Sequence, residues 1–305
     1  MKGKILNILR KERTVVSGET LSDQLQISRV SIWKHINKLK ALGYDIAATA
    51  KGYRLISAPD APFPWEFTKR APTIRYFDEV TSTMDVARDL ARKDCPDFTV
   101  VVAERQKTGR GRMQRVWLSP GGGLYFTIVL RPPLPPVFSY RINYAASMIL
   151  AKTLRRMYRI DAGVKWPNDI LVDGKKIAGL LSEMEAESDR ITYLNVGIGI
   201  NVNNDPPISE PGASSLKRIL GKEVSRKVLL SEFLDGFESR IAHRPLNHVI
   251  AEWKACTVTL NRRVRIVTTR EMSEGLALDV DENGALILAL DDGTVKKIMH
   301  GDCFH

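Results

Sequence analysis

Cysteine is scarce in this 305-residue chain, and the three cysteines that it has form no metal-binding pattern. Cys95, Cys256 and Cys303 stand far apart, so neither a disulfide framework nor a cysteine-ligated metal is expected. No apolar run approaches the roughly 20 residues that span a membrane. The N-terminal stretch MKGKILNILRKER is too charged for a secretory signal. We therefore expect a cytoplasmic protein with reduced thiols and no membrane partner.

Positive charge is unevenly distributed along the chain. Residues 1–58 hold 11 Lys and Arg against 4 Asp and Glu, so +7 of the net charge of +11 lies in the first fifth of the sequence. The hydrophobic share of 44% is ordinary for a globular protein, and the length suffices for two or three domains. The charge asymmetry predicts a polyanion-binding module at the N-terminus.

The N-terminal segment has the pattern of three short helices and a hairpin. Apolar residues at helical spacing predict a first helix around residues 5–9, and Thr20–Asp23 resembles a capping box that would open the second. A third helix follows, and then residues 44–48 and 52–56 are predicted as two strands. This order predicts a winged helix-turn-helix DNA-binding domain over residues 1–58.

The third helix is the candidate DNA-contacting element. Ser28 is its expected N-cap, and it should run to about Leu42 with Ile32, Ile36 and Leu39 on one buried face. Basic side chains on the opposite face suit phosphates, and small polar ones suit base edges. The candidate DNA-binding residues are Ser28, Arg29, Ser31, Lys34, Asn37 and Lys38. A helical module for dimerisation or protein docking is the alternative, which a basic rather than apolar face disfavours.

Three prolines in the stretch from Ser57 to Pro64 predict a stiff linker. We expect a second domain over residues 65–258 and a third over residues 259–305. Strands and helices mix in the second domain without strict alternation, which favours an α+β fold with a mixed sheet. In the third domain, Glu-Asn-Gly and Asp-Asp-Gly turns separate short strands, so a small all-β domain is predicted.

A loop rich in glycine and arginine connects two predicted buried strands, one from Thr99 to Val102 and one from Leu124 to Leu130. The tetrapeptide Gly109-Arg110-Gly111-Arg112 combines bare backbone N–H groups with guanidinium groups, and a second glycine cluster follows at residues 121–123. This combination suits a compact anion such as a phosphate or a carboxylate. A mobile, solvated basic loop is the alternative for the tetrapeptide alone.

Three blocks of sequence resemble the biotin protein ligases, in the order and approximate spacing of that family. The first is Gln106-(x)5-Arg112-(x)4-Trp117-Leu-Ser-Pro-Gly-Gly-Gly. The second is Val164-Lys165-Trp166-Pro167-Asn168-Asp169 with Lys175-Lys176-Ile177-Ala178-Gly179, and the third is Gly197-Ile198-Gly199-Ile200-Asn201. One departure is Gln114, where several members carry a glycine. The larger members also have an N-terminal winged helix-turn-helix and repress biotin genes, so the resemblance covers the full chain.

The resemblance implies a central ligase domain of the biotin/lipoate ligase type and a small C-terminal SH3-like β-barrel. It implies that ATP and Mg²⁺ are used to form biotinyl-5′-adenylate, and that biotin is then transferred to a lysine of the biotin carboxyl carrier protein of acetyl-CoA carboxylase. It further implies that the adenylate-bound chain forms a homodimer, binds operator DNA and represses biotin synthesis genes.

The resemblance also assigns residues to the ligase site. Lys176, Arg112 and Asp169 are the candidate catalytic residues, with Asp169 also the candidate Mg²⁺ ligand beside ATP. The candidate biotin- and adenylate-binding residues are Ser82, Thr83, Met84, Gln106, Gly109, Arg110, Gly111, Arg112, Trp117, Lys165, Asn168, Lys176, Gly179 and Asn201. From the residues alone, Ser82 or Thr83 could simply cap a helix, and Lys176, the Asn168–Asp169 pair and Asn201 could be ordinary turn residues.

Three other functions remain compatible with these patterns. A lipoate ligase shares the expected catalytic fold and also makes an adenylate, although the blocks around Arg112 and Lys176 favour biotin. A biotin sensor without transfer activity is the second, and a ligase whose N-terminal domain does not repress is the third.

Overall fold

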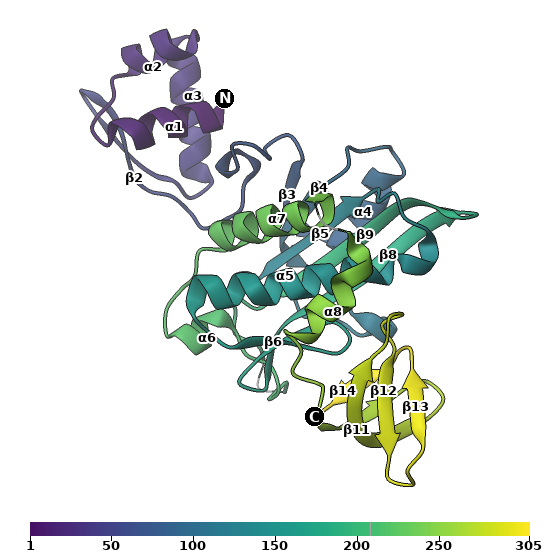
Figure 1. Ribbon diagram of the computed structural model, residues 1–305. Helices are drawn as coiled ribbons and strands as arrows, with labels where there is room; N and C mark the ends of the chain where they lie inside the picture. Colours follow the sequence, from purple (N-terminus) through teal and green to yellow (C-terminus); the bar gives the residue numbers. More distant parts are fainter. Residues whose placement is uncertain (208, 244) are drawn as a thin grey trace. The chain divides into compact units, whose positions relative to one another are not determined.

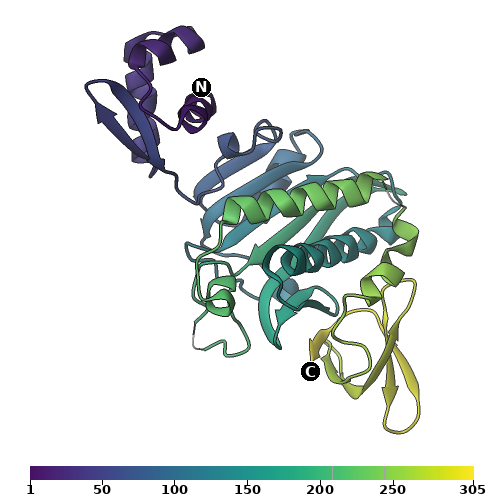
Figure 2. The same ribbon diagram turned by 60° about the vertical axis from the view of Figure 1, so that its left-hand side comes forward.

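The computed structural model describes residues 1–207, 209–243 and 245–305, apart from the side chain of Gln114. The chain divides into two compact units, Met1–Pro72 and Thr73–His305, which are described separately below (Figures 1 and 2). Within these described ranges no helix combines the length and the apolar character needed to cross a membrane.

The first unit contains three helices and a two-stranded antiparallel hairpin, as predicted (Figure 1). Its elements are α1 (Lys2–Glu12), α2 (Gly18–Leu25), α3 (Arg29–Ala41), β1 (Asp45–Thr49) and β2 (Gly52–Ser57). Apolar side chains from all three helices are at most 1% exposed and form the core of the unit: Ile5, Leu6, Leu9, Leu21, Ile32, Ile36 and Leu39. The helical periodicity of the sequence therefore identified the buried face of α3 correctly.

The caps of α2 and α3 show where local sequence reasoning succeeded and where it failed. Ser28 caps α3 as predicted, because its hydroxyl accepts a hydrogen bond from Ser31 N at 3.2 Å. The capping box predicted at Thr20–Asp23 is wrong, since α2 begins at Gly18. Ser17 has an extended backbone and accepts from Thr20 N at 2.9 Å, so the residue with the capping geometry lies one turn earlier.

The segment after the predicted linker packs back onto the first unit. A short 3-10 helix, η1 (Pro64–Glu66), places Glu66 against Arg10, whose Nη2 donates to both carboxylate oxygens at 2.8 and 2.9 Å. Tyr44 donates to the same carboxylate at 2.5 Å and accepts from Trp65 Nε1 at 2.9 Å. The compact unit therefore continues well beyond residue 58, through Pro72.

A seven-stranded mixed sheet forms the frame of the second unit, with strand order β3-β4-β5-β9-β8-β7-β6. Only β3 and β4 are parallel among these neighbours, and the other pairs are antiparallel. The strands are β3 (Ile74–Val80), β4 (Thr99–Gln106), β5 (Leu124–Leu130), β6 (Ala162–Lys165), β7 (Asp169–Val172), β8 (Lys175–Glu187) and β9 (Arg190–Ile200). The predicted α+β fold with a mixed sheet is confirmed.

Helices cover both faces of this sheet, and adjacent residues of β5 show which helix lies on which face. Phe126 packs against Phe233 of α7 (Arg226–His243), with ring centroids 5.6 Å apart. Thr127 points to the opposite face, where its hydroxyl contacts Thr83 at the start of α4 (Thr83–Ala91). The long helix α5 (Tyr140–Tyr158) lies beside α7 (Figure 1). The shorter helices are η2 (Arg112–Gln114), η3 (Pro136–Phe138), α6 (Leu216–Leu220), η4 (Leu246–His248) and α8 (Val249–Lys254).

The end of the chain forms a five-stranded antiparallel sheet in the order β13-β12-β11-β10-β14. Its strands are β10 (Arg263–Val267), β11 (Met272–Val280), β12 (Leu286–Leu290), β13 (Val295–Ile298) and β14 (Asp302–Phe304). The carbonyl of Gly284 accepts from Tyr144 OH at 2.8 Å and from Trp166 Nε1 at 3.1 Å. These bonds join the small sheet directly to α5 and to the segment between β6 and β7.

Candidate functional site

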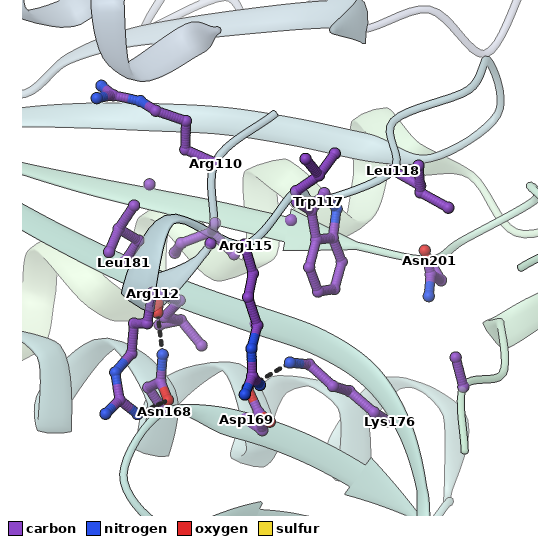
Figure 3. A pocket seen from close by; sticks show the side chains of 18 of the residues that line it. Arg110, Arg112, Arg115, Trp117, Leu118, Asn168, Asp169, Lys176, Leu181 and Asn201 are labelled. Carbon is purple, nitrogen blue, oxygen red and sulfur yellow. Dashed lines mark hydrogen bonds and ion pairs between the residues drawn. The ribbon is translucent and has the colours of Figure 1, made fainter. Parts of the chain in front are cut away.

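One cavity of about 260 Å³ gathers the predicted ligase residues on the α4 side of the large sheet (Figure 3). Every predicted ligase-site residue except Gly109 lines this cavity: Ser82, Thr83, Met84, Gln106, Arg110, Gly111, Arg112, Trp117, Lys165, Asn168, Asp169, Lys176, Gly179 and Asn201. Residues from the strand–helix turn before α4, the glycine-rich loop and four strands of the sheet therefore meet at one place.

Uncharged polar groups occupy one end of the cavity. Ser82 is the N-cap of α4 and accepts from Met84 N at 3.2 Å. Thr83 N donates to Gln106 Oε1 at 2.8 Å, which fixes the side-chain amide of Gln106 against the first turn of α4. The capping role that the sequence suggested for Ser82 is thus present, and it leaves the hydroxyl hydrogen of Ser82 available to a ligand.

At the other end of the cavity, the carboxylate of Asp169 lies between two lysines. Asp169 Oδ1 lies 2.8 Å from Lys176 Nζ, and Asp169 Oδ2 lies 3.7 Å from Lys165 Nζ. The hairpin of β6 and β7 pairs Lys165 with Asp169, while β8 brings Lys176 alongside. Among the described residues no group of three or more His, Cys, Asp or Glu could hold a metal ion. The single carboxylate of Asp169 fits Mg²⁺ only together with oxygens from substrate phosphates.

Arg112 lies beside this cluster and is anchored from two directions. Its Nη1 donates to Asn168 Oδ1 at 2.9 Å, and its Nη2 donates to the Gly301 carbonyl at 2.9 Å. Burial lowers the pKa of Arg112 below the ordinary arginine value, and the neighbouring Asp302 and Asp169 oppose this effect. A guanidinium removed from water interacts more strongly with an anion than an exposed one does.

Arg110 points away from the lysines and Asp169 (Figure 3). Its guanidinium forms ion pairs with Asp85 at 3.0 Å and with Glu183 at 3.2 Å. Arg88 contacts the same two carboxylates, at 3.3 and 3.0 Å. The side chain of Arg110 therefore attaches the glycine-rich loop to α4 and β8, and its charge is already compensated.

The remaining predicted residues shape the wall of the cavity. A side chain at Gly109 would collide with the Trp117 carbonyl oxygen and with Ser119 Oγ, which explains the glycine there. The Trp117 ring lies against Gly179 and Gly199, with Lys176 Nζ 5.3 Å from the ring centroid. Asn201 is 6% exposed and accepts from Asn204 Nδ2 at 2.9 Å, so it both lines the cavity and closes a turn.

Several lining residues were not predicted. They include Arg115, Val116 and Leu118 from the loop, Asn204, and Asp302, Cys303 and Phe304 from β14. Arg115 pairs with Asp302 and so ties the loop to the small C-terminal sheet. The repeated arginines of the loop could have suggested Arg115, but a three-residue strand almost 190 residues away carries no local signal. The side chain of Gln114 lies outside the described residues.

The predicted DNA-contacting face belongs to the first unit. Ser28, Arg29, Lys34, Asn37 and Lys38 are exposed on or beside α3, whereas Ser31 is half-buried and its hydroxyl accepts from Ser28 Oγ at 3.1 Å. Two large apolar side chains share this face, Val30 at 62% and Trp33 at 55% exposed. A basic helix with exposed apolar groups is compatible with both phosphate and base contacts.

Three family models match consecutive parts of the chain. An HTH domain matches residues 2–54, the biotin/lipoate A/B protein ligase family matches residues 76–203, and the biotin protein ligase C terminal domain matches residues 259–305. The fold and the site thus place the chain among the biotin/lipoate ligases with an added helix-turn-helix.

Similarity to individual proteins identifies the family within this class. The bifunctional ligase/repressor BirA of Bacillus subtilis is 35% identical over 302 residues, which covers 94% of this chain and 93% of that protein. The bifunctional ligase/repressor BirA of Escherichia coli is 26% identical, over 94% of this chain and 91% of that protein. A biotin protein ligase from Aquifex aeolicus, solved in complex with biotin and ATP, is 27% identical with a TM-score of 0.63, over 76% of this chain and 97% of that one. The chain belongs to the family of bifunctional ligase/repressors.

Proposed function

We propose that this protein activates biotin with ATP to biotinyl-5′-adenylate and transfers the biotin to a lysine of the biotin carboxyl carrier protein of acetyl-CoA carboxylase. The observation that carries the proposal is the polarity of the cavity. Uncharged hydrogen-bonding groups of Ser82, Thr83 and Gln106 lie at one end, and the cations of Lys176 and Arg112 lie at the other. Biotin has the same polarity, with a neutral ureido ring at one end and a carboxylate at the other.

The cationic end is suited to forming an acyl-adenylate. A carboxylate oxygen of biotin attacks the α-phosphorus of ATP, the bond to the bridging oxygen of the β-phosphate breaks, and pyrophosphate leaves. Negative charge accumulates on the α-phosphate oxygens during this step, so fixed cations nearby stabilise the transition state. We assign this role to Lys176 and Arg112.

Asp169 has two proposed roles. With the phosphate oxygens of ATP it would hold Mg²⁺, which neutralises phosphate charge when it is bound. Asp169 would also orient Lys176, with which it is already paired at 2.8 Å, and could accept the proton of the acceptor lysine during transfer. Asn168, Lys165, Trp117, Gly179 and Asn201 are proposed as further binding residues because they line the same cavity.

The ligase proposal is tested by ATP–pyrophosphate exchange with the full chain, run separately with biotin, lipoate and octanoate. Exchange with biotin alone is expected. Exchange only with lipoate or octanoate would identify a lipoate-type ligase instead, and tight biotin binding without exchange would identify a sensor.

We also propose that the adenylate-bound protein forms a homodimer, binds operator DNA through α3 and represses biotin synthesis genes. A ligand favours the dimer only if it binds the dimeric state more tightly than the monomer. Sedimentation velocity with and without biotin plus ATP tests this, and a monomer at all protein concentrations would contradict it. The proposed functional domains are residues 1–58, 65–258 and 259–305, the last an SH3-like barrel, although residues 65–72 pack within the first compact unit. The proposed location is the cytoplasm.

A further inference from the structure

Behind the uncharged end of the cavity, a buried threonine begins a chain of hydrogen bonds. Thr127, on β5, is 0% exposed, and its hydroxyl donates to Thr83 Oγ1 at 2.9 Å. Thr83 Oγ1 in turn donates to Gln106 Oε1 at 3.1 Å, and Gln106 Nε2 donates to Ser119 Oγ at 2.8 Å. Ser119 Oγ completes the chain by donating to the Trp117 carbonyl at 3.0 Å.

Backbone groups fix, at two points, which atoms donate and which accept in this series of hydrogen bonds. The Trp117 carbonyl can only accept, so the Ser119 hydroxyl must donate to it and accept from Gln106. The backbone N–H of Thr83 can only donate, so the amide oxygen of Gln106 must face it, at 2.8 Å. Because Gln106 Oε1 faces Thr83, the Thr83 hydroxyl donates to that oxygen and accepts from Thr127.

The fixed direction decides what each group offers to a ligand. Gln106 Oε1 already accepts two hydrogen bonds, so Gln106 offers only its second N–H, which has no acceptor among the described residues. Thr83 offers only a lone pair, since its hydroxyl hydrogen is used. Ser82 offers its hydroxyl hydrogen, because its oxygen accepts from Met84 N. The cavity therefore presents two hydrogen-bond donors, Ser82 and Gln106, and one acceptor, Thr83. Ser82 and Thr83 are consecutive in the turn before α4, and Gln106 lies on the facing strand β4.

We propose that Thr127 and Ser119 are positioning residues: their hydrogen bonds hold the Thr83 hydroxyl and the Gln106 amide in the orientations whose polarity the backbone groups fix, and this favours a cyclic urea head group. This inference rests on the proposed ligase function. A cyclic urea has one carbonyl that accepts two hydrogen bonds, from Ser82 and Gln106, and two flanking N–H groups, one of which donates to Thr83. A dithiolane ring or an alkyl end would leave the same buried groups unpaired, and binding is weakened when that occurs.

The test compares Thr127→Val, which keeps the shape and removes the hydroxyl, with Thr127→Ser, which keeps the hydroxyl. Both are measured in the full-length protein by ATP–pyrophosphate exchange. For Thr127→Val we expect KM for biotin to rise by about five- to tenfold, the effect of one lost hydrogen bond in a buried chain. The kcat and the KM for ATP should stay within about twofold, and Thr127→Ser should restore the KM for biotin.

Thr99→Val is the matched control. Thr99 is also 0% exposed, lies on the neighbouring strand β4 and donates its hydroxyl hydrogen to the Pro96 carbonyl at 2.6 Å, outside the chain described above. The substitution Thr99→Val removes an equally buried hydroxyl, so it should lower stability without changing the KM for biotin. Ser119→Ala supplies a second variant at the far end of the chain, should Thr127→Val fail to fold, and its KM for biotin should rise in the same way.

The outcomes separate this inference from the proposed function. Wild-type exchange with biotin but an unchanged KM in Thr127→Val and Ser119→Ala would overturn the positioning role and leave the ligase proposal standing. A lower kcat together with equal rises in the KM for biotin and the KM for ATP would also overturn it. Such a result would indicate a structural defect only. Absence of exchange with biotin in the wild-type protein would overturn both. A raised KM for biotin in Thr127→Val and Ser119→Ala, with kcat and the KM for ATP within about twofold of wild type, is the result that the proposal requires.

Discussion

Arg112 Nη1 donates to Asn168 Oδ1 over 2.9 Å, and this bond joins the glycine-rich loop to the turn that carries Asp169. The second terminal nitrogen of Arg112 bonds the Gly301 carbonyl at 2.9 Å, so the same guanidinium also reaches the C-terminal sheet. Three segments far apart in the sequence are therefore held around one cation. Arg112 and Asn168 both line the cavity, and under the proposed function this arrangement would help to exclude water from a bound acyl-adenylate.

Replacing Arg112 should release the adenylate. Loss of the cation in Arg112→Gly should slow adenylation. Both bonds of the guanidinium are also lost and the loop has one more flexible residue, so we expect the biotinyl-adenylate that does form to escape faster into solution. Free adenylate acylates lysines indiscriminately. Incubation with biotin, ATP and an unrelated lysine-rich protein should therefore label that protein, as measured by avidin blotting. Selectivity equal to that of the wild-type protein would contradict this role of Arg112.

Lys176 should be required for adenylation, whereas the adjacent lysine should not. Lys176 Nζ lies 2.8 Å from Asp169 and reaches the cavity, but Lys175 is exposed and does not line it. Removal of a cation that stabilises developing charge costs about 10²–10³ in rate. We expect Lys176→Ala to lose that factor in pyrophosphate exchange and Lys175→Ala to retain normal rates. Similar rates for the two variants would exclude Lys176 as the catalytic cation.

The sequence predicted the strands and helices of the frame better than the contacts of the loop. The apolar run from Leu124 to Leu130 identified a strand with the bounds that the structure has, because this strand is buried along its whole length. The sequence could not identify the partners of Arg110, because Asp85 and Glu183 come from a helix and a strand brought together only by the fold. The contacts of β14 could not be predicted either, because a strand of three residues is too short to show a hydrophobic periodicity.

The ion pairs of Arg110 should control the order of the loop more than global stability. Asp85 and Glu183 are about one-third exposed, and pairs of this kind contribute only ~0.2–1 kcal/mol each. In the double variant Asp85→Asn, Glu183→Gln we expect a small change in melting temperature but faster tryptic cleavage after the loop arginines. Peptide mapping of limited digests measures this. Glu187→Gln, at the exposed end of β8, is the control and should leave cleavage unchanged.

The thiol of Cys303 should be unreactive in the folded protein. Burial raises the pKa of Cys303 to about 12, and because only the thiolate is alkylated, its reactive fraction near pH 8 is on the order of 10⁻⁴. Its alkylation rate should rise with pH up to that value. Half-buried Cys95 should be modified first by iodoacetamide. Mass spectrometry of the labelled peptides tests the order, with urea-unfolded protein as the control in which all three cysteines react.

The basic face of α3 should account for DNA binding and leave ligation intact. Lys34 and Lys38 are exposed on this face, and each phosphate contact contributes a slope of about −0.9 to the dependence of log K on log salt concentration. In Lys34→Ala, Lys38→Ala we expect operator affinity to fall at least tenfold in gel-shift assays, and the salt slope to become shallower by about two if both lysines contact phosphates. Lys4→Ala, Lys11→Ala is the control of equal charge, because these exposed lysines lie on α1. If both double variants lose affinity equally, net charge rather than α3 determines binding. If only the α3 variant loses affinity while pyrophosphate exchange stays normal, the two activities reside in separate units of the chain.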